Sequence, residues 1–379
     1  MKTLHIIAFD IPFPANYGGV IDIYYKLKNL KKNNFKITLH CFEYGRERSK
    51  KLDELCDKIY YYKRNIYKNP LTSNLPYIVE TRSSKYVLRN LLQDEAPILF
   101  EGLHTTYFLD HPQLKNRYKI LRTHNVEHEY YKHLEWVEKN FFKKYFFRIE
   151  SERLKKYQKR IHHANLLCPL SLKDELYFKK IHPNVKFIAP FHINNEILIK
   201  EGKGDFILYH GNLAVGENNQ AALFLLKEVF SKIKFPVIIA GSKPSNELTH
   251  LVNKLPNVSL QVNIGSDKIY ELIQQAQINL LYTEQATGVK LKLINSLYLG
   301  KFCMVNEKMI KGTKLHKECI VCSSPIDFVD QIEFYFQANF DAKKIKERKE
   351  FLKNSIFDLA KATKNIVSLI SSQKQEALN

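Results

Sequence analysis

The sequence predicts an α/β protein with two doubly wound parallel sheets. Short apolar runs alternate with stretches in which apolar residues recur at helical spacing, and the alternation continues along most of the 379 residues. The rhythm lapses once, near the middle of the chain, and then restarts with a new apolar run. Because a chain of this length exceeds what one hydrophobic core usually organises, we expect two domains.

The first domain is expected over residues 1–195. It opens with an apolar run at 3–9, which stops before two prolines and the pair Gly18-Gly19, and helical spacing of apolar residues begins at Val20. This order predicts a strand, a glycine turn and a helix. Further buried strands are predicted at residues 36–42, 58–62, 98–101, 119–123 and 166–170.

The second domain is expected over residues 204–335, after a segment that contains Pro190 and Asn194-Asn195 and lacks any clear period. Its predicted strands are 206–209, 237–240, 258–262, 278–282, 302–306 and 320–322, and its predicted helices are 219–231, 246–254, 267–275 and 291–299. Residues 336–379 read as helices that pack back toward the first domain, with a frayed end.

Composition excludes a disordered chain, because 45% hydrophobic residues against 26% charged ones can build a sizeable core. The six cysteines are scattered, the start lacks the apolar stretch of a signal peptide, and no run reaches the length of a membrane span. We therefore expect a cytoplasmic protein whose membrane contact, if any, is peripheral.

Positive charge is concentrated in the first half of the chain. The formal net charge is +20, and residues 1–200 hold 36 Lys and Arg against 21 Asp and Glu, a net +15 that leaves +5 for the rest. The first domain is thus expected to meet an acidic membrane surface, a phosphorylated substrate or a nucleic acid. We do not expect nucleic acid, because no recognition motif accompanies the charge.

Lys290 and Lys292 form the strongest candidate for an anion site. They open a predicted helix directly after an apolar strand and Thr287-Gly288, and the rest of that helix is mostly apolar. The positive end of a helix together with two ammonium groups suits a diphosphate. Two solvated surface lysines remain the alternative.

His124 is the candidate catalytic residue of the first domain. It follows a predicted strand within Arg122-Thr-His-Asn-Val-Glu-His128, so its imidazole is expected at the carboxyl edge of the sheet, where it could steady a sugar or phosphate. A helix-capping role is the equal alternative. A zinc site with Glu127 and His128 is disfavoured because a nearby third ligand is missing.

Three further patterns have competing explanations. Gly18-Gly19 could cradle a phosphate or only allow a tight strand-to-helix connection. Cys319-x-x-Cys322 could bind metal, but we favour packing because a second pair is missing. The basic, aromatic stretch 127–163 could lie on anionic lipid, but we favour aromatic rings that face the core and lysines that face water.

Four motifs together resemble glycosyltransferase family 4, the retaining enzymes of bacterial surface polysaccharide assembly. The motifs are Pro14-Ala-Asn-Tyr-Gly-Gly19, Arg122-Thr-His-Asn-Val-Glu127, Tyr209-His-Gly-Asn-Leu213, and Gly288-x-Lys290-x-Lys292-x-x-Asn295 with Gly300-Lys301. The resemblance spans most of the chain. It implies a GT-B fold, in which two Rossmann-like domains face each other across a cleft.

The resemblance also implies roles for individual residues. The implied catalytic residues are His124, Lys290 and Glu284; the donor-binding residues are Gly18, Gly19, Gly211, Asn212, Thr287, Gly288, Lys290, Lys292 and Asn295; the acceptor-binding residues are Arg122, Asn125 and Glu127. Asn295 stands where the family has a glutamate that holds ribose, and Glu284 or Thr287 stands in for the glutamate beside the donor sugar. The family's basic pair after Gly211 is absent, so Lys290 and Lys292 would take over its duty.

The resemblance implies transfer of a sugar from a nucleotide sugar to a glycan or lipid-linked acceptor, without a cofactor. Built-in cations can stabilise the departing diphosphate, so no metal is expected. The alternatives are a nucleotide-sugar epimerase of the same architecture and a non-catalytic basic protein that binds nucleic acid or anionic lipid.

Overall fold

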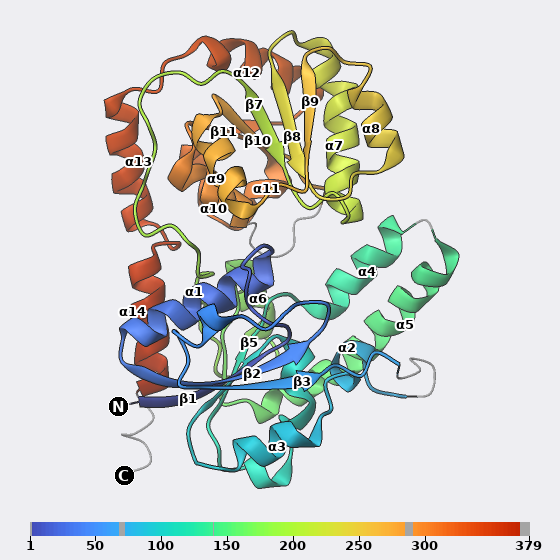
Figure 1. Cartoon of the computed structure of the whole chain (residues 1–379), viewed down its shortest axis with the longest axis vertical. Helices are drawn as coiled ribbons and strands as arrows, with labels where there is room; N and C mark the ends of the chain where they lie inside the picture. The colour runs from blue at the N-terminus through green and yellow to red at the C-terminus, as the bar shows by residue number, and fades with distance from the viewer. Residues whose placement is uncertain (1, 68–72, 139, 285–290, 372–379) are drawn as a thin grey trace. The chain divides into compact units, whose positions relative to one another are not determined.

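The computed structural model describes residues 2–67, 73–138, 140–284 and 291–371, and the chain divides into two compact units (Figure 1). Unit 1 comprises Met1–Ile193 with Leu359–Asn379, and unit 2 comprises Asn194–Asp358. The division falls inside the segment 189–204, where the sequence places the linker. The tail is shared between the units rather than returning whole to the first, because only its last helix belongs to unit 1.

Unit 1 is a parallel sheet of six strands in the order β3-β2-β1-β4-β5-β6. Its strands are β1 (Lys2–Ala8), β2 (Phe35–Glu43), β3 (Lys58–Lys63), β4 (Ile98–Glu101), β5 (Lys119–Arg122) and β6 (Leu166–Leu167). Its helices are α1 (Gly18–Lys32), α2 (Tyr77–Glu80), α3 (Lys85–Leu91), α4 (Glu127–Val137), α5 (Phe141–Tyr157), α6 (Leu172–Phe178) and α14 (Leu359–Ser371).

Unit 2 is a second parallel sheet of six strands, ordered β12-β11-β10-β7-β8-β9. Its strands are β7 (Ile207–His210), β8 (Val237–Gly241), β9 (Val258–Val262), β10 (Ile278–Leu281), β11 (Phe302–Asn306) and β12 (Ile320–Cys322). Its helices are α7 (Gly216–Glu228), α8 (Asn246–Val252), α9 (Ser266–Gln275), α10 (Leu291–Leu299), α11 (Glu307–Ile310), α12 (Pro325–Gln337) and α13 (Ala342–Asn354).

The predicted fold class is confirmed, and its physical basis is visible in the strands. Every residue of β4, β7, β10 and β11 is buried, as expected for parallel strands covered on both faces. The main difference from prediction is β6, which was expected over 166–170 and ends at Leu167. Pro169 lacks the N–H that would continue the ladder, so the strand cannot reach its expected length.

Side-chain caps define where several helices begin. An oxygen of the residue before the helix accepts from a backbone N–H of the first turn at Asn140 (α5), Ser171 (α6), Ser245 (α8), Ser324 (α12) and Asp341 (α13). Helix α1 begins at Gly18, so the two glycines form its first residues and not a separate turn before it. A Cβ at Gly19 would lie 2.5 Å from the Phe9 ring, so glycine permits this close approach of helix and strand.

Each sheet contains one point at which the strand order reverses direction. In unit 1 this point lies between β1 and β4, and in unit 2 it lies between β7 and β10. In open α/β sheets, ligands bind beyond the carboxyl ends of the two strands that flank such a point. The search for functional side chains therefore begins with the residues that follow these four strands.

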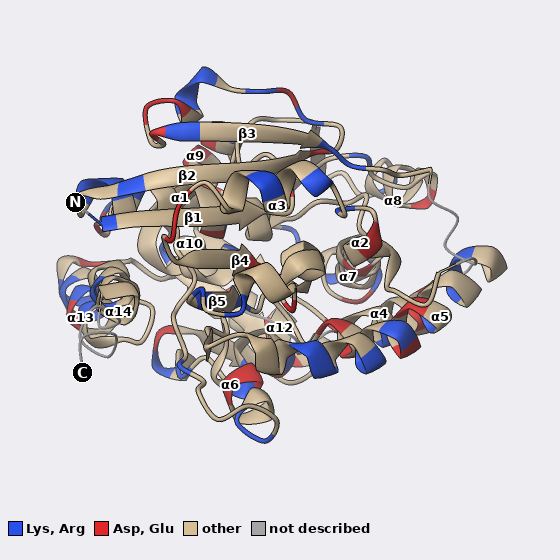
Figure 2. Ribbon diagram, turned by 90° about the horizontal axis from the view of Figure 1, so that it is seen from below, with Lys and Arg blue, Asp and Glu red and all other residues tan. Residues whose placement is uncertain are grey.

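Lys and Arg are spread over several elements of unit 1, as Figure 2 shows for α3, α5 and the ends of β2 and β3. Within the described part of the chain, no helix is both long and apolar enough to cross a membrane.

Candidate functional site

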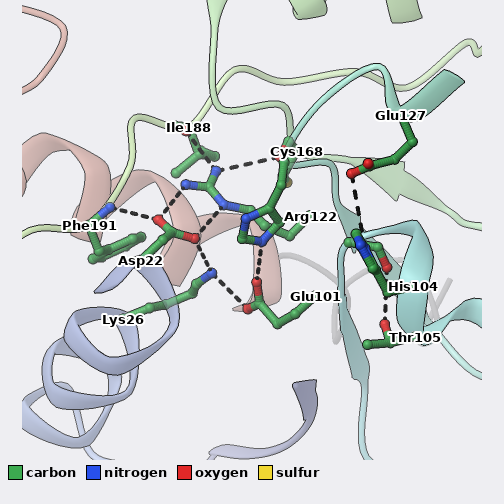
Figure 3. A network of polar contacts seen from close by, with 12 residues as sticks. Asp22, Lys26, Glu101, His104, Thr105, Arg122, Glu127, Cys168, Ile188 and Phe191 are labelled. Atoms are coloured by element: carbon green, nitrogen blue, oxygen red, sulfur yellow. Dashed lines mark hydrogen bonds and ion pairs between the residues drawn. The ribbon is translucent and has the colours of Figure 1, made fainter. Parts of the chain in front are cut away.

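A buried charge cluster lies beyond the carboxyl ends of β4 and β5 in unit 1 (Figure 3). It consists of Asp22 and Lys26 on α1, Glu101 at the end of β4, Arg122 at the end of β5, and His124. Lys26 Nζ donates to Asp22 Oδ2 at 2.8 Å and to Glu101 Oε1 at 2.7 Å. Arg122 donates to both carboxylate oxygens of Asp22, at 3.2 and 2.9 Å.

The two carboxylates of the cluster remain ionised although they are buried. Burial by itself raises the pKa of Asp22, but the charges of Arg122 and Lys26 outweigh burial and hold this pKa below its usual value. Burial likewise raises the pKa of Glu101, while Lys26 and His124 bring it below its usual value. Asp22 and Glu101 therefore carry the two negative charges that balance Lys26 and Arg122.

The side chain of Arg122 lies in the interior of unit 1. Its side chain is fully buried, and its Nη1 and Nη2 atoms donate to the carbonyl oxygens of Ile188 at 2.6 Å and Ala189 at 3.0 Å, besides Asp22. The expectation that Arg122 binds an acceptor is corrected: its guanidinium joins α1 and β5 to the segment that closes unit 1, and no part of it is exposed to an incoming molecule.

His124 lies at the edge of the cluster, between the end of β5 and the start of α4. Its Nε2 lies 3.1 Å from Glu101 Oε2, and its ring meets the Phe9 ring edge-on. An ionised carboxylate only accepts hydrogen bonds, so the Nε2 atom that faces it carries a proton. Glu101 thus fixes both the tautomer and the orientation of His124, whose side chain is 8% exposed.

The cluster is the one group of possible metal ligands found among the described residues. Three possible ligand atoms, one each from Asp22, Glu101 and His124, lie within 4.8 Å of one another. The Lys26 ammonium already contacts both carboxylates, so a metal ion would have to displace a buried cation. The donor set does not fit a metal. The His124-x-x-Glu127-His128 pattern does not form a zinc site on one helix, because His124 precedes α4 and His128 Nδ1 pairs with Gln158.

Glu127 and His104 form a second polar pair in unit 1. Glu127 Oε1 and His104 Nδ1 are buried 4.0 Å apart, and neither atom has a hydrogen-bond partner. Burial raises the pKa of Glu127 to about 8, against a weaker opposing effect of Asn125, and burial lowers the pKa of His104. Both side chains are therefore uncharged near neutral pH, which suits a hydroxyl group better than an anion.

Lys292 is the candidate anion-binding residue of unit 2, and it lies near the carboxyl end of β7. It lies in the first turn of α10, where its Nζ is 3.4 Å from Asn218 Oδ1 and 5.6 Å from the centre of the Tyr209 ring. His210, at the end of β7, is buried next to it: burial lowers the pKa of His210 to about 3, and the charge of Lys292 acts in the same direction. Lys292 thus brings a half-buried positive charge to the carboxyl end of β7.

The turn after β7 is held by its own side chains. Asn212 Oδ1 accepts from the backbone N–H of Ala214, and the Asn212 carbonyl accepts from Asn218 Nδ2. A Cβ at Gly211 would lie 3.1 Å from Asn218 Cγ. Contact of Gly211 and Asn212 with a donor stays a prediction, as it does for Gly18 and Gly19.

Glu284 and Asn295 have structural partners. Glu284 is exposed and accepts hydrogen bonds from Lys308 and Tyr282; burial tends to raise its pKa, but these two bonds bring it below its usual value. Asn295 is buried on α10, and its Oδ1 accepts from Asn194 Nδ2 at 2.8 Å. Thr287, Gly288 and Lys290 lie outside the described residues.

The sequence did not single out Asp22, Lys26, Glu101 or His104. One local signal was present, since Asp22 and Lys26 are charged residues four positions apart within an otherwise apolar stretch of helix. Cys319 and Cys322 are both free thiols, and Cys322 is buried on β12.

No family model matches the chain. A Klebsiella pneumoniae protein described as an uncharacterized 44.6 kDa protein in cps region is 25% identical over 388 residues, which cover 91% of this chain and 98% of that protein.

Solved glycosyltransferases share the architecture over nearly their whole length. A glycosyltransferase from Rickettsia africae has a TM-score of 0.65 at 14% identity, with 98% of each chain covered. Anabaena HepE, solved with UDP and glucose, has a TM-score of 0.66 at 9% identity, with 98% of this chain and 100% of that chain covered. WaaG, a glycosyltransferase involved in lipopolysaccharide biosynthesis, has a TM-score of 0.64 at 12% identity, with 97% and 99% covered. These likenesses, with the two parallel sheets, identify the fold as GT-B.

Proposed function

We propose that this chain is a glycosyltransferase of the family 4 type, which moves a hexosyl group from a nucleotide-sugar donor to a glycan or lipid-linked acceptor. The observation that carries the proposal is that each sheet has a chemically suitable charged side chain at its reversal point: a cation beside β7 in unit 2, and in unit 1 a carboxylate at the end of β4 that binds the His124 imidazole. The architecture shared with solved glycosyltransferases supports the same conclusion.

The donor diphosphate is assigned to unit 2, near Lys292 and the turn that contains Gly211 and Asn212. Cleavage of the bond between sugar and diphosphate places negative charge on the leaving group, and a preorganised ammonium stabilises this charge in the transition state. The neutral state of His210 is compatible with the assignment, because this neighbour places no like charge beside the Lys292 ammonium. Thr287, Gly288, Lys290 and Asn295 complete the proposed donor site.

The acceptor hydroxyl is assigned to unit 1. Glu127 and Asn125 keep their expected roles there, and His104 joins them, because an uncharged carboxyl and imidazole with unpaired atoms can hydrogen-bond a sugar hydroxyl. His124 contacts the transferred sugar in this proposal. Glu101 is a positioning residue, since it acts through His124.

The reaction is proposed to proceed with retention and without a metal or cofactor. The bond from the anomeric carbon to the diphosphate oxygen breaks, the acceptor oxygen bonds to the same face, and its proton passes to a diphosphate oxygen. In this proposal a lysine side chain offsets the charge of the diphosphate, so no metal ion is needed there. The carboxylates of Asp22 and Glu101, which could otherwise hold a metal ion, already pair with Lys26 and Arg122. Surface polysaccharide synthesis at the inner face of the plasma membrane is the proposed setting, in keeping with six free cysteines.

The test is to incubate the full chain with UDP-, GDP- and dTDP-sugars, with and without simple glycoside acceptors, and to follow sugar release and product by NMR. Slow hydrolysis or transfer with one nucleotide, and an anomeric configuration kept in the product, is the expected result. An epimerised donor sugar would assign the chain to the epimerases. Absence of both turnover and nucleotide binding by calorimetry would overturn the proposal in favour of a non-catalytic protein.

A further inference from the structure

Helices α4 and α5 form an antiparallel hairpin in unit 1 whose end carries exposed aromatic rings. We call these rings the aromatic tip: Trp136 (75% exposed), Phe141 (74%), Phe142 (82%) and Tyr145 (56%). In Figure 1 the hairpin extends beyond the covered sheet of unit 1. The tip lies on both sides of residue 139, which is outside the described residues.

The exposure of the tip corrects the expectation that the aromatic residues of 127–163 face the core. Other residues of the hairpin do so: Leu154 and Tyr157 are buried, and Tyr131 on α4 meets Phe147 on α5 at 5.9 Å. The interior of the hairpin is therefore already filled. The rings of the tip contact one another or a neighbour, as Phe141 and Phe142 do at 6.0 Å, and turn their remaining surface outward.

Basic residues accompany the tip along α5. Lys143, Lys144 and Arg148 are exposed, and Figure 2 shows α5 with several blue segments. Of the two acidic residues of α5, Glu150 is buried and its carboxylate accepts from the backbone N–H groups of Tyr77 and Ile78, while Glu152 is exposed and lies farther along the helix from the tip. The outward side of α5 near the tip thus combines apolar rings with positive charge.

We propose that the aromatic tip, with Lys143, Lys144 and Arg148, docks on the surface of an anionic lipid bilayer. Tryptophan and phenylalanine insert at the boundary between headgroups and acyl chains, and lysine or arginine beside them pairs with anionic headgroups. The contact is peripheral, since the described helices include none that could span the bilayer. This inference rests on the hairpin alone and holds whether or not the chain transfers sugars.

A second copy of the chain fits this surface less well. In a symmetric dimer the same patch meets itself, so Lys143 and Lys144 of each copy would approach the like charges of the other. The end of a two-helix hairpin also offers a narrow surface, whereas stable protein interfaces bury broad ones. A bilayer surface accepts a narrow tip and supplies the opposite charge.

The chain carries its own probe, because Trp136 is its single tryptophan. Vesicles of phosphatidylglycerol mixed with phosphatidylcholine are expected to shift Trp136 emission to the blue, and lipids brominated near the headgroup are expected to quench it. Vesicles of phosphatidylcholine alone are expected to bind about tenfold or more weakly. Unchanged emission with the anionic vesicles, together with no co-sedimentation, would overturn the proposal.

Two matched pairs of variants separate the rings from the charges. Phe141→Ser with Phe142→Ser is expected to abolish co-sedimentation, whereas Phe334→Ser on α12, where the ring is 67% exposed, is expected to leave it unchanged. Lys143→Glu with Lys144→Glu is expected to weaken anionic-vesicle binding about tenfold or more. Lys179→Glu with Lys180→Glu, an exposed pair elsewhere in unit 1, is expected to have little effect.

Folding of each variant is checked by circular dichroism and thermal unfolding, so that loss of binding is not mistaken for loss of structure. Equal effects of the test and control pairs would overturn the role of the tip. Concentration-dependent dimerisation that depends on Phe141 and Phe142, without vesicle binding, would replace the bilayer by a second copy.

Discussion

Glu101 holds the imidazole of His124 by a 3.1 Å contact between Oε2 and Nε2, although Glu101 ends β4 and His124 follows the end of β5. The other carboxylate oxygen of Glu101 accepts from the buried Lys26 ammonium at 2.7 Å. The orientation of His124 is therefore fixed through Glu101 by a charge on α1. This linkage gives the first prediction.

Glu101→Gln is expected to lower kcat about 100-fold while KM for the donor stays near its wild-type value. The neutral amide no longer fixes the tautomer of His124, but the donor groups of unit 2 are untouched. Steady-state kinetics across a range of pH checks this, with a pH profile altered in the variant. Glu95→Gln, at an 88% exposed carboxylate, is the control and should behave as wild type. A stable Glu101→Gln protein with unchanged kcat would contradict the positioning role.

Arg122→Met is expected to destabilise unit 1 by about 3–5 kcal/mol, because Asp22 and two carbonyl groups lose a buried partner. Arg160→Met removes a half-exposed ion pair with Asp110 and should cost about 1 kcal/mol or less. Urea unfolding followed by circular dichroism compares the two variants. Similar losses in both would mean that the cluster contributes no more than a surface pair.

Lys292→Met is expected to weaken binding of the preferred nucleoside diphosphate about tenfold to a hundredfold, since a charge-assisted contact with phosphate is lost. Isothermal titration calorimetry measures this directly. Lys268→Met, which breaks an exposed pair with Glu271, is the matched control. Undiminished binding by a folded Lys292→Met protein would place the diphosphate elsewhere.

Protonation of His210 is expected to lower the free energy of unfolding of the protein at acidic pH. The pKa of His210 is about 3 in the folded chain, because burial and Lys292 disfavour the imidazolium, and near 6.5 when unfolded. Below the unfolded pKa the unfolded state binds the additional proton, so the stability contributed by neutral His210 is present above about pH 6.5 and is lost as the pH falls toward 3.

The loss amounts to about 2 kcal/mol between pH 7 and pH 5. In His210→Asn the stability should fall less over this interval, while substitution of the exposed His250 should leave the fall unchanged. Urea unfolding at the two pH values provides the comparison. If the free energy of unfolding fell equally in wild type and His210→Asn between pH 7 and pH 5, protonation of His210 would carry no cost to the fold.

The sequence predicted the type of the elements and their order along the chain well. Strands buried on both faces are continuous apolar runs, whereas the helices that cover them have apolar residues at helical spacing. The expected strands at 98–101 and 258–262 and the expected helix at 291–299 coincide with β4, β9 and α10. The helix after the first strand was equally readable, although Gly18 and Gly19 begin that helix and do not form a turn before it. The end of β6 was missed although Pro169 was visible, since the apolar pattern continues past the last ladder hydrogen bond.

The candidate site was predicted only in part. His124 and Lys292 were assigned from their position after predicted strands; in the structure His124 follows β5, and Lys292 lies in the first turn of α10 near the Tyr209 ring of β7. The role of Arg122 was wrong, because the same strand position is compatible with a side chain that points into the unit. Glu101 and His104 were missed because nothing in their local sequence distinguishes a buried charge from an exposed one.

The sequence by itself determined that the chain forms two parallel sheets and where most of their strands and helices lie along it, because these follow from the spacing of apolar residues. Only the tertiary structure decided that Lys26 pairs with both Asp22 and Glu101 and that Phe142 remains exposed. Pairing between distant residues and exposure to solvent depend on which other segments pack against a side chain. That information belongs to the folded arrangement and not to any stretch of sequence read alone.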